Sequence, residues 1–281
     1  MTDAIDIWCN LFTPEAVRHY WFETEEIRQV ISWWRMEERI KGYPIPQFLS
    51  LLDEAGVEKV LIPAVKMRSY RTGEMLWDMT AEEVASVVAQ GQGRFHGLMG
   101  INPWRRMEGV REVEIAVKEY GFGGAHLHPY GFGLPVNHRF YFPFYAKCAE
   151  LDVPVQIQVG HSAEMMPSAV ARPIFLDDIA LYFPTLKLIG AHTGWPWVEE
   201  MLAIAWKHPN VYVGTSMHAP RYWDPSLVRF INTRGADKVL FGTDFPGLQH
   251  KETLAQVEAL GLREESKKKI LRDNALRVYN L

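Results

Sequence analysis

Short apolar runs rich in β-branched residues alternate with longer amphipathic segments along the whole chain. Eight of these runs have the length and composition of buried strands, and each follows a turn and ends in polar or aromatic residues. The predicted strands are 4–10, 59–66, 95–102, 124–130, 153–160, 186–192, 210–216 and 238–244. Strands that alternate with helical segments in this way predict a parallel sheet.

The segments between the strands carry helical periodicity and helix start signals. Thr80 and Glu83, for example, form a capping box before AEEVASVVAQ. The other predicted helices are 105–120, 140–151, 173–182, 196–207, 224–236 and 251–280. Eight strand-and-helix units without a linker predict an α/β fold, one (β/α)8 TIM barrel that forms a single domain over residues 1–281. A doubly wound sheet would carry a glycine fingerprint after its first strand, and IDIWCNLF has none.

One stretch is much longer than an ordinary loop between the first strand and its helix. Residues 11–46 form an aromatic-rich helical insertion over the strand ends, and its aromatic residues are Tyr20, Trp21, Phe22, Trp33 and Trp34. Aromatic surface of this extent needs a partner. We expect the insertion to be a lid over a substrate or part of a dimer interface, with plain packing onto the barrel as the third alternative. A homo-oligomer is therefore predicted.

Charge and composition narrow the choice of partners. The formal net charge is −4, and the sequence lacks the clustered basic residues of a nucleic-acid-binding protein. No apolar run reaches the roughly 20 residues of a membrane-spanning helix. The sequence starts without the pattern of a secretory signal and has only two cysteines, Cys9 and Cys148. A cytoplasmic protein with a small-molecule substrate, and with neither nucleic acid nor membrane as a partner, is expected.

The candidate catalytic residues lie where barrel enzymes build their sites, at the C-terminal ends of the strands. His192 ends the sixth strand and Asp244 the eighth, so the two side chains can act as an acid/base pair or hold a metal with its activated water. His126 and His128 end the fourth strand two residues apart and point the same way. We predict His192, Asp244 and His128 as catalytic residues.

Other residues near the strand ends are expected to bind the substrate. Period-two alternation places Asp6, Trp8 and Asn10 on one face of the first strand and Cys9 on the opposite face. The predicted substrate-binding residues are Trp8, Asn10, His126, Gln158, His161 and Trp195. A rim of flat side chains favours a planar ligand. The predicted rim is Trp8, Trp104, Tyr130, Phe132, Trp195, Trp197, Tyr222, Trp223 and Phe245.

Several segments together resemble the amidohydrolase-2 family of metal-dependent TIM-barrel hydrolases, which includes the aminocarboxymuconate semialdehyde decarboxylase type. These segments, which span the whole chain, are the first-strand Asp6, LHP of 127–129, PVQIQVG, LIGAHTGWPWVEEML, HPNVYVGTS, VLFGTDFP and DNALRVYNL. The resemblance implies a divalent metal, most often zinc. Its ligands would be an H-x-H on strand one, a histidine on strand five and Asp244, with His192 placed for catalysis.

Three of the implied ligand positions differ in this chain. The H-x-H falls on Trp8 and Asn10, and the strand-five histidine falls on Gln158. Neither an indole nor a neutral amide is a good zinc ligand. A displaced set of ligands would be drawn from the strand-end histidines and Asp244, and the candidates are His161, His192 and Asp244. We expect any zinc to be weakly held and sub-stoichiometric.

The resemblance and the polar strand ends together favour an enzyme. The leading interpretation is a hydrolase that acts on a small, aromatic or unsaturated carboxylate or carbonyl compound by hydrolysis or C–C bond cleavage. A non-oxidative decarboxylase of the same family is the first alternative, because both reactions need an acid/base group and an electrophile that stabilises an enolate-like charge. A catalytically degenerate barrel that only binds a ligand is the second alternative.

Overall fold

Eight parallel strands form one sheet in the order β1-β2-β5-β6-β7-β8-β9-β10. The computed structural model describes residues 3–281, so the first two residues of the predicted domain lie outside it. The strands are β1 (Ala4–Asp6), β2 (Val57–Ala64), β5 (Phe95–Gly100), β6 (Ala125–Leu127), β7 (Val155–Gln158), β8 (Leu188–Ala191), β9 (Val211–Gly214) and β10 (Val239–Leu240). Each lies within or overlaps one of the eight predicted runs, and the order along the chain confirms the predicted parallel arrangement.

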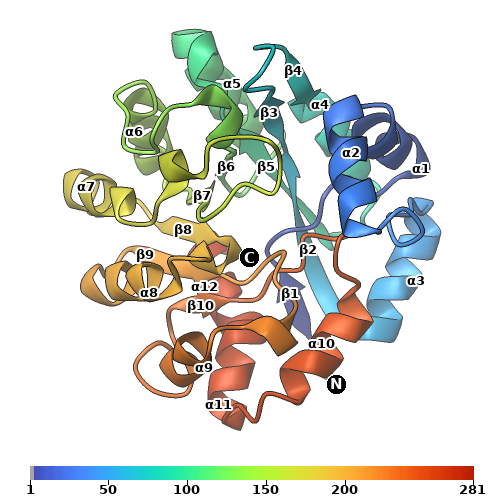
Figure 1. Ribbon diagram of the computed structural model, residues 1–281, viewed down its shortest axis with the longest axis vertical. Coiled ribbons are helices and arrows are strands. Elements are labelled where there is room, and N and C mark those ends of the chain that lie inside the picture. Colours follow the sequence, from blue (N-terminus) through green and yellow to red (C-terminus); the bar gives the residue numbers. More distant parts are fainter. Residues whose placement is uncertain (1–2) are drawn as a thin grey trace.

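Backbone hydrogen bonds also join the two ends of this sheet. The amide of Ile7 donates to the carbonyl of Phe241 at 3.0 Å, and the amide of Asp244 donates to the carbonyl of Trp8 at 2.8 Å. The strands are short and the helices surround them (Figure 1). The result is the α/β, TIM-barrel-like fold that the alternation of strands and helices predicted.

The helices form the outer layer around the strands (Figure 1). The α-helices are α1 (Pro14–Ala16), α2 (Glu25–Trp34), α3 (Ile45–Ala55), α4 (Ala81–Val88), α5 (Arg106–Lys118), α6 (Phe142–Glu150), α7 (Phe175–Tyr182), α8 (Val198–Lys207), α9 (Pro225–Ile231), α10 (His250–Glu258), α11 (Glu264–Lys268) and α12 (Asn274–Tyr279). Two π-helices, η1 (Val17–Phe22) and η7 (Lys269–Asp273), join neighbouring α-helices. The hydroxyl of Thr80 accepts a hydrogen bond from the amide of Glu83 at 3.1 Å, so half of the predicted capping box forms.

Two predicted elements differ from the structure. The helix predicted over 251–280 is divided: α10 ends at Glu258, and Gly261, with a positive φ of 66°, lies in the connection to α11. An antiparallel hairpin of β3 (Lys66–Arg68) and β4 (Met75–Asp78) follows β2. The sequence predicted no separate hairpin in this stretch. This hairpin lies on the same side as the candidate site and contributes residues to it.

The first strand departs from strict alternation. Ile5 and Ile7 belong to the apolar cluster inside the barrel, whereas Asp6 lies outside it and accepts hydrogen bonds from His250 Nε2 at 2.8 Å and Thr243 N at 2.9 Å. The regular strand ends at Asp6. The prediction that Asp6 shares a face with Trp8 and Asn10 is therefore wrong, since the chain bends between them.

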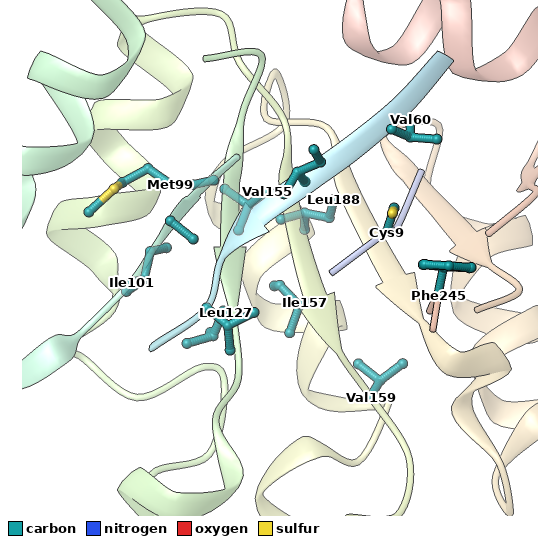
Figure 2. Close-up of a cluster of buried hydrophobic side chains, with 14 of the residues drawn as sticks. Cys9, Val60, Met99, Ile101, Leu127, Val155, Ile157, Val159, Leu188 and Phe245 are labelled. Carbon is teal, nitrogen blue, oxygen red and sulfur yellow. The ribbon is translucent and has the colours of Figure 1, made fainter. Parts of the chain in front are cut away.

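Two apolar layers hold the fold together. Outward-facing side chains of the strands pack beneath the helices, and Figure 2 shows Val155, Ile157 and Leu188 in this layer. The predicted outward orientation of Cys9 is confirmed, because Cys9 belongs to the same layer. Because successive residues of a strand point to opposite faces, Gln156 and Gln158 of β7 point inward.

The base of the barrel is closed by the C-terminal helix α12. Its residues Val278 and Tyr279 pack with Ile5 and Leu98 from the strands. The amide of Gln156 donates to the backbone carbonyl of Ile7 at 2.8 Å and to the Tyr279 hydroxyl at 3.3 Å. This amide nitrogen is thus bonded within the protein, at the end of the barrel that α12 covers.

Two further observations concern the predicted setting of the chain. Over residues 3–281, no helix combines the length and the apolar character that crossing a bilayer requires. Cys9 and Cys148 are both buried and unbridged.

Candidate active site

A cavity lies where the C-terminal ends of the strands meet. Its volume is about 70 Å³. Its polar lining consists of Asn10, Gln158, His161, Glu164, His192, His218 and Asp244. Its other lining residues are Trp8, Trp21, Ile27, Val30, Ile31, Trp34, Val65, Met67, Trp77, Ala163, Met217 and Gly247. Neither lysine nor arginine is among these residues, so the described cavity has no permanently cationic side chain.

The roof of the cavity comes from the segment that the sequence singled out as an insertion. Ile27, Val30, Ile31 and Trp34 of α2 line it, and Trp21 of η1 lies beside them. These α2 positions recur at intervals of three and four residues, which places them on one face of the helix. Trp33, on the same helix, does not line the cavity and is 54% exposed.

Three side chains form a directed chain of hydrogen bonds on one wall. The indole nitrogen of Trp8 donates to Asn10 Oδ1 at 3.3 Å, and Asn10 Nδ2 donates to Asp244 Oδ1 at 2.7 Å. The same Nδ2 donates to the carbonyl of Phe245 at 3.0 Å. Because an indole N–H can only donate, it fixes the orientation of the Asn10 amide.

Burial determines the protonation of Asp244. It raises the pKa of the carboxyl group to about 7, and the negative charges of Glu164 and Asp6 act in the same direction, whereas the hydrogen bond from Asn10 opposes the rise. A carboxyl group with a pKa near neutrality can both donate and accept a proton at ordinary pH.

His192 faces the cavity from the end of β8, and its ring is neutral. Burial lowers its pKa to about 3, and nearby His218 acts in the same direction. The Ser216 hydroxyl oxygen lies 3.0 Å from His192 Nδ1. A hydroxyl that donates to Nδ1 leaves the proton of the neutral ring on Nε2, where it is available to a ligand.

Glu164 is a carboxylate next to His128, and 15% of its side chain is exposed. Burial raises its pKa, but the proximity of His128 and a hydrogen bond from the Ser162 hydroxyl at 2.7 Å together lower it to about 2. The closest atoms of the two side chains, Glu164 Oε2 and His128 Nε2, are 3.7 Å apart. Because this distance exceeds that of a hydrogen bond, the attraction between them is mainly electrostatic.

Two more imidazoles border the cavity. The ring centroids of His161 and His218 are 6.1 Å apart, and burial lowers the pKa of both rings, that of His218 to about 4. Trp195 lies behind His161, with ring centroids 4.7 Å apart, and its backbone carbonyl accepts a hydrogen bond from the His161 amide at 2.8 Å. Trp195 itself does not line the cavity.

The backbone is strained at the strand ends that carry these groups. His192, Met217 and Asp244 all adopt positive φ angles, of 62°, 67° and 63°. Non-glycine residues rarely adopt this conformation, and each instance costs on the order of 1–3 kcal/mol. Three instances around one cavity are typical of a functional site rather than of a structural end of a barrel.

The structure brings together six of the nine residues predicted as catalytic or substrate-binding. Trp8, Asn10, Gln158, His161, His192 and Asp244 line the cavity. His128 lies behind Glu164, and His126 lies behind Trp8, with ring centroids 4.6 Å apart. Both rings are buried and have no hydrogen-bond partner among the described residues.

Of the predicted aromatic rim, only Trp8 lines the described cavity. Trp104 and Tyr222 are exposed, whereas Tyr130 and Phe245 are buried outside the cavity. The flat side chains that line it are Trp8, Trp21, Trp34 and Trp77. Three of these come from the segment 11–46 and the β3–β4 hairpin, because these segments, and not the strand ends alone, cover the barrel.

Sequence reasoning missed Glu164, Ser216 and the apolar face of α2. Glu164 lies three residues after His161 in the loop that follows β7, and Ser216 lies two residues beyond the end of β9. Both positions satisfy the rule that barrel sites gather at strand ends. The recurrence of Ile27, Val30, Ile31 and Trp34 was the signal for the roof.

The donors around Asp244 do not fit a divalent metal. The nearest partner of its carboxylate is an amide N–H, which repels a cation instead of binding it. Within residues 3–281, no three His, Cys, Asp or Glu side chains are grouped as metal ligands require. The displaced candidates His161, His192 and Asp244 thus share a cavity without forming such a group.

Comparisons with known proteins identify relatives that match 60% to 82% of the chain. It is 28% identical to 2-keto-4-carboxy-3-hexenedioate hydratase of Sphingobium sp. over 60% of this chain and 60% of that protein. It is 27% identical to gamma-resorcylate decarboxylase of Polaromonas sp. over 82% of this chain and 86% of that protein. The chain therefore spans less than two thirds of the hydratase but most of the decarboxylase.

A solved structure shows the same fold. It is a dihydroxybenzoic acid decarboxylase from Polaromonas sp. JS666 with bound manganese and the inhibitor 2-nitroresorcinol. The TM-score is 0.72 and the sequence identity 22%, over 100% of this chain and 98% of that one. A family model described as "Amidohydrolase" matches residues 5–281. The fold, the cavity at the strand ends and this match lead to one conclusion: the chain belongs to the amidohydrolase family.

Proposed function

We propose that this protein is a non-oxidative decarboxylase of a small, planar, hydroxyl-bearing aromatic or unsaturated carboxylate. One observation carries the proposal: the Asp244 carboxyl group, with a pKa of about 7, lies in the wall of a tryptophan-rich cavity beside the neutral ring of His192. A proton donor in a flat, apolar cavity suits the protonation of an electron-rich ring carbon. The named decarboxylase relative supports the same reaction.

The reaction needs one proton and no other reactant. Asp244 donates its proton to the ring carbon that bears the carboxylate, and the hydroxyl substituents make that carbon basic. The bond to the carboxylate carbon then breaks, its electron pair returns to the ring, and carbon dioxide leaves. The product carries hydrogen in place of the carboxylate. The Asp244 carboxylate regains a proton from water.

Some residues of the cavity are suited to contact the substrate ring, and others are suited to bind the substrate carboxylate. Indole rings at Trp8, Trp21, Trp34 and Trp77 provide flat apolar contacts. Because no lysine or arginine lines the described cavity, hydrogen bonds from neutral N–H groups, such as those of the imidazole rings and the Gln158 amide, can hold the substrate carboxylate. We assign this role to His161, with His192 directing its ring at the reacting carbon.

The sequence alone favoured hydrolysis over decarboxylation, and the relatives reverse this preference. The decarboxylase relative, which matches most of both chains, places C–C cleavage first and hydrolysis second. The manganese in the similar structure belongs to that protein. The donor set around Asp244 here does not favour zinc or manganese, and our scheme uses neither.

We also assign α2 the role of a lid. The cavity of about 70 Å³ is smaller than the roughly 150 Å³ cavity that holds benzene in an engineered protein. A substituted benzoate therefore fits only after the roof has moved. The segment 11–46 would open for the substrate and close over it, which excludes water from the protonation step.

A reducing, cytoplasmic setting and a homo-oligomeric state complete the proposal. Two buried, unbridged cysteines support the first. The exposed indole of Trp33 supports the second, because exposed aromatic surface is typical of interfaces.

A substrate panel tests the proposal directly. Purified protein is incubated with 2,6-dihydroxybenzoate, other hydroxybenzoates, an unsaturated keto acid, and aryl esters and lactones as hydrolysis substrates. We expect loss of carbon dioxide from at least one hydroxybenzoate, detected by chromatography of the phenol product. Hydrolysis of an ester or lactone without any decarboxylation would overturn the proposal. Binding of the panel without turnover would support the degenerate barrel instead.

A further inference from the structure

Three hydrogen bonds fix the orientation of the Asn10 amide. Its Nδ2 lies 2.7 Å from Asp244 Oδ1 and 3.0 Å from the Phe245 carbonyl oxygen, so two acceptors share one donor group. Its Oδ1 accepts from the indole of Trp8 at 3.3 Å. If the amide were flipped, its oxygen would face two acceptors, Asp244 Oδ1 and the Phe245 carbonyl, and its nitrogen would face the Trp8 N–H donor. The N–H side of Asn10 is therefore fixed toward Asp244.

Trp8 also fills the space between two imidazoles. Its ring centroid lies 4.6 Å from that of His126 and 4.7 Å from that of His192, and only 1% of its surface is exposed. The third changed position, Gln158, is 8% exposed and offers a neutral amide. Steric and electrostatic factors thus both disfavour a metal ion beside Asp244.

We propose that the Asn10 amide, held by Trp8, takes the place of the metal ion beside Asp244, and that the site operates with protein groups alone. The amide N–H supplies the partial positive charge that a cation would supply, and it holds Asp244 Oδ1. Asp244 Oδ2 has no hydrogen-bond partner among residues 3–281, and this oxygen is left for the ligand. Asn10 is a positioning residue in this arrangement, and the inference goes beyond the proposed reaction because it does not depend on which bond is broken.

Metal titration of the full chain tests the proposal without any substrate. Protein is treated with EDTA, desalted, and titrated with MnCl2 and separately with ZnCl2 by calorimetry; metal content is measured after a second desalting step. We expect the wild-type protein to retain less than about a tenth of an equivalent of either metal. The variant Trp8→His/Asn10→His/Gln158→His restores the imidazole positions and should retain about one equivalent.

A matched variant separates new ligands from a merely disturbed site. Trp8→Phe/Asn10→Leu/Gln158→Leu changes the same three positions without adding donors and should stay metal-free. Retention of one metal ion by the wild-type protein, with loss of binding in Asp244→Ala, would overturn the proposal. If circular dichroism shows that the histidine variant is unfolded, the wild-type titration still decides, because the proposal predicts its result independently.

Discussion

Burial has opposite chemical consequences for the two central side chains. It raises the pKa of the Asp244 carboxyl group to about 7 and lowers the pKa of the His192 imidazole to about 3. Both shifts favour the uncharged form of the group, as expected where water is excluded. Near neutrality the site therefore holds a carboxyl group ready to donate a proton and an imidazole that does not carry a charge.

The first prediction concerns the pH dependence of turnover. Because Asp244 acts as the acid, kcat should be constant below about pH 7 and fall about tenfold per pH unit above it as the carboxyl group ionises. His192 stays neutral down to about pH 3, so it should add no acidic limb between pH 4 and 7. Steady-state rates from pH 4 to 9 check this. A rate that rises through pH 7 would show that Asp244 is instead needed as a base.

The second prediction is that Asp244 and His192 act together in one step. Asp244→Asn and His192→Asn should each lower kcat by roughly 10²- to 10⁴-fold, because each removes a proton-transfer or orienting group. The double variant should be little worse than either single variant, since residues that act together are non-additive. Additive losses would contradict a shared step.

A surface histidine provides the control for this pair. His19→Asn should leave kcat unchanged, because the His19 side chain is 65% exposed and does not line the cavity. His208 is unsuitable as a control. Its ring is buried and lies 2.6 Å from Asp177.

Among the elements, α2 has the most direct influence on access to the site. Four of its residues line the cavity, and its last helical residue is followed by Arg35 with a positive φ of 56°. The segment that precedes it, η1, adds Trp21 to the same roof. The roof thus consists of one short helix and its neighbour, and no barrel strand is part of it.

The third prediction is that opening of α2 limits binding. Tryptophan fluorescence in a stopped-flow experiment with resorcinol, the product expected from 2,6-dihydroxybenzoate, should give an observed rate that levels off at high resorcinol concentration. Ile31→Ala removes contacts in the roof and should raise the limiting rate several-fold. Trp33→Ala lies on the exposed face of the same helix and should leave it unchanged. A rate that stays proportional to resorcinol concentration would rule out a lid.

The elements differ in how far the sequence could predict them. All eight strands were found, because buried parallel strands leave continuous apolar runs. The alternation failed at Asp6, where the chain bends after a strand of three residues. The sequence predicted the site residues that lie at strand ends, such as His192 and Asp244. It was missed where it depends on how α2 and the β3–β4 hairpin fold back over the barrel, because helix periodicity shows an apolar face but not what that face covers.

For the whole molecule, the barrel has one closed and one open end. α12 packs against the base through Val278 and Tyr279, and the site lies at the opposite end beneath α2. The surface beside that end carries exposed aromatic groups, including Trp33, Trp195 and Tyr222. Exposed aromatic side chains favour association with another chain.

The fourth prediction is therefore a dimer or larger homo-oligomer. Sedimentation velocity at micromolar concentration should give a mass of at least twice the 32.4 kDa of the chain. If the helix that carries Trp33 takes part in the interface, Trp33→Glu should weaken the association, because it places a charge in an apolar contact. A single species at the mass of one chain would contradict this prediction.

The central claim is that Asp244 delivers a proton to a carboxylate-bearing carbon without a metal ion. EDTA-treated protein is incubated in D2O with the best hydroxybenzoate of the panel, and the phenol product is analysed by mass spectrometry and NMR. The account predicts turnover without added metal, one deuterium at the carbon that carried the carboxylate, and a loss of roughly 10²- to 10⁴-fold in Asp244→Asn. Turnover that appears only after manganese or zinc is added, or that persists unchanged in Asp244→Asn, would contradict it.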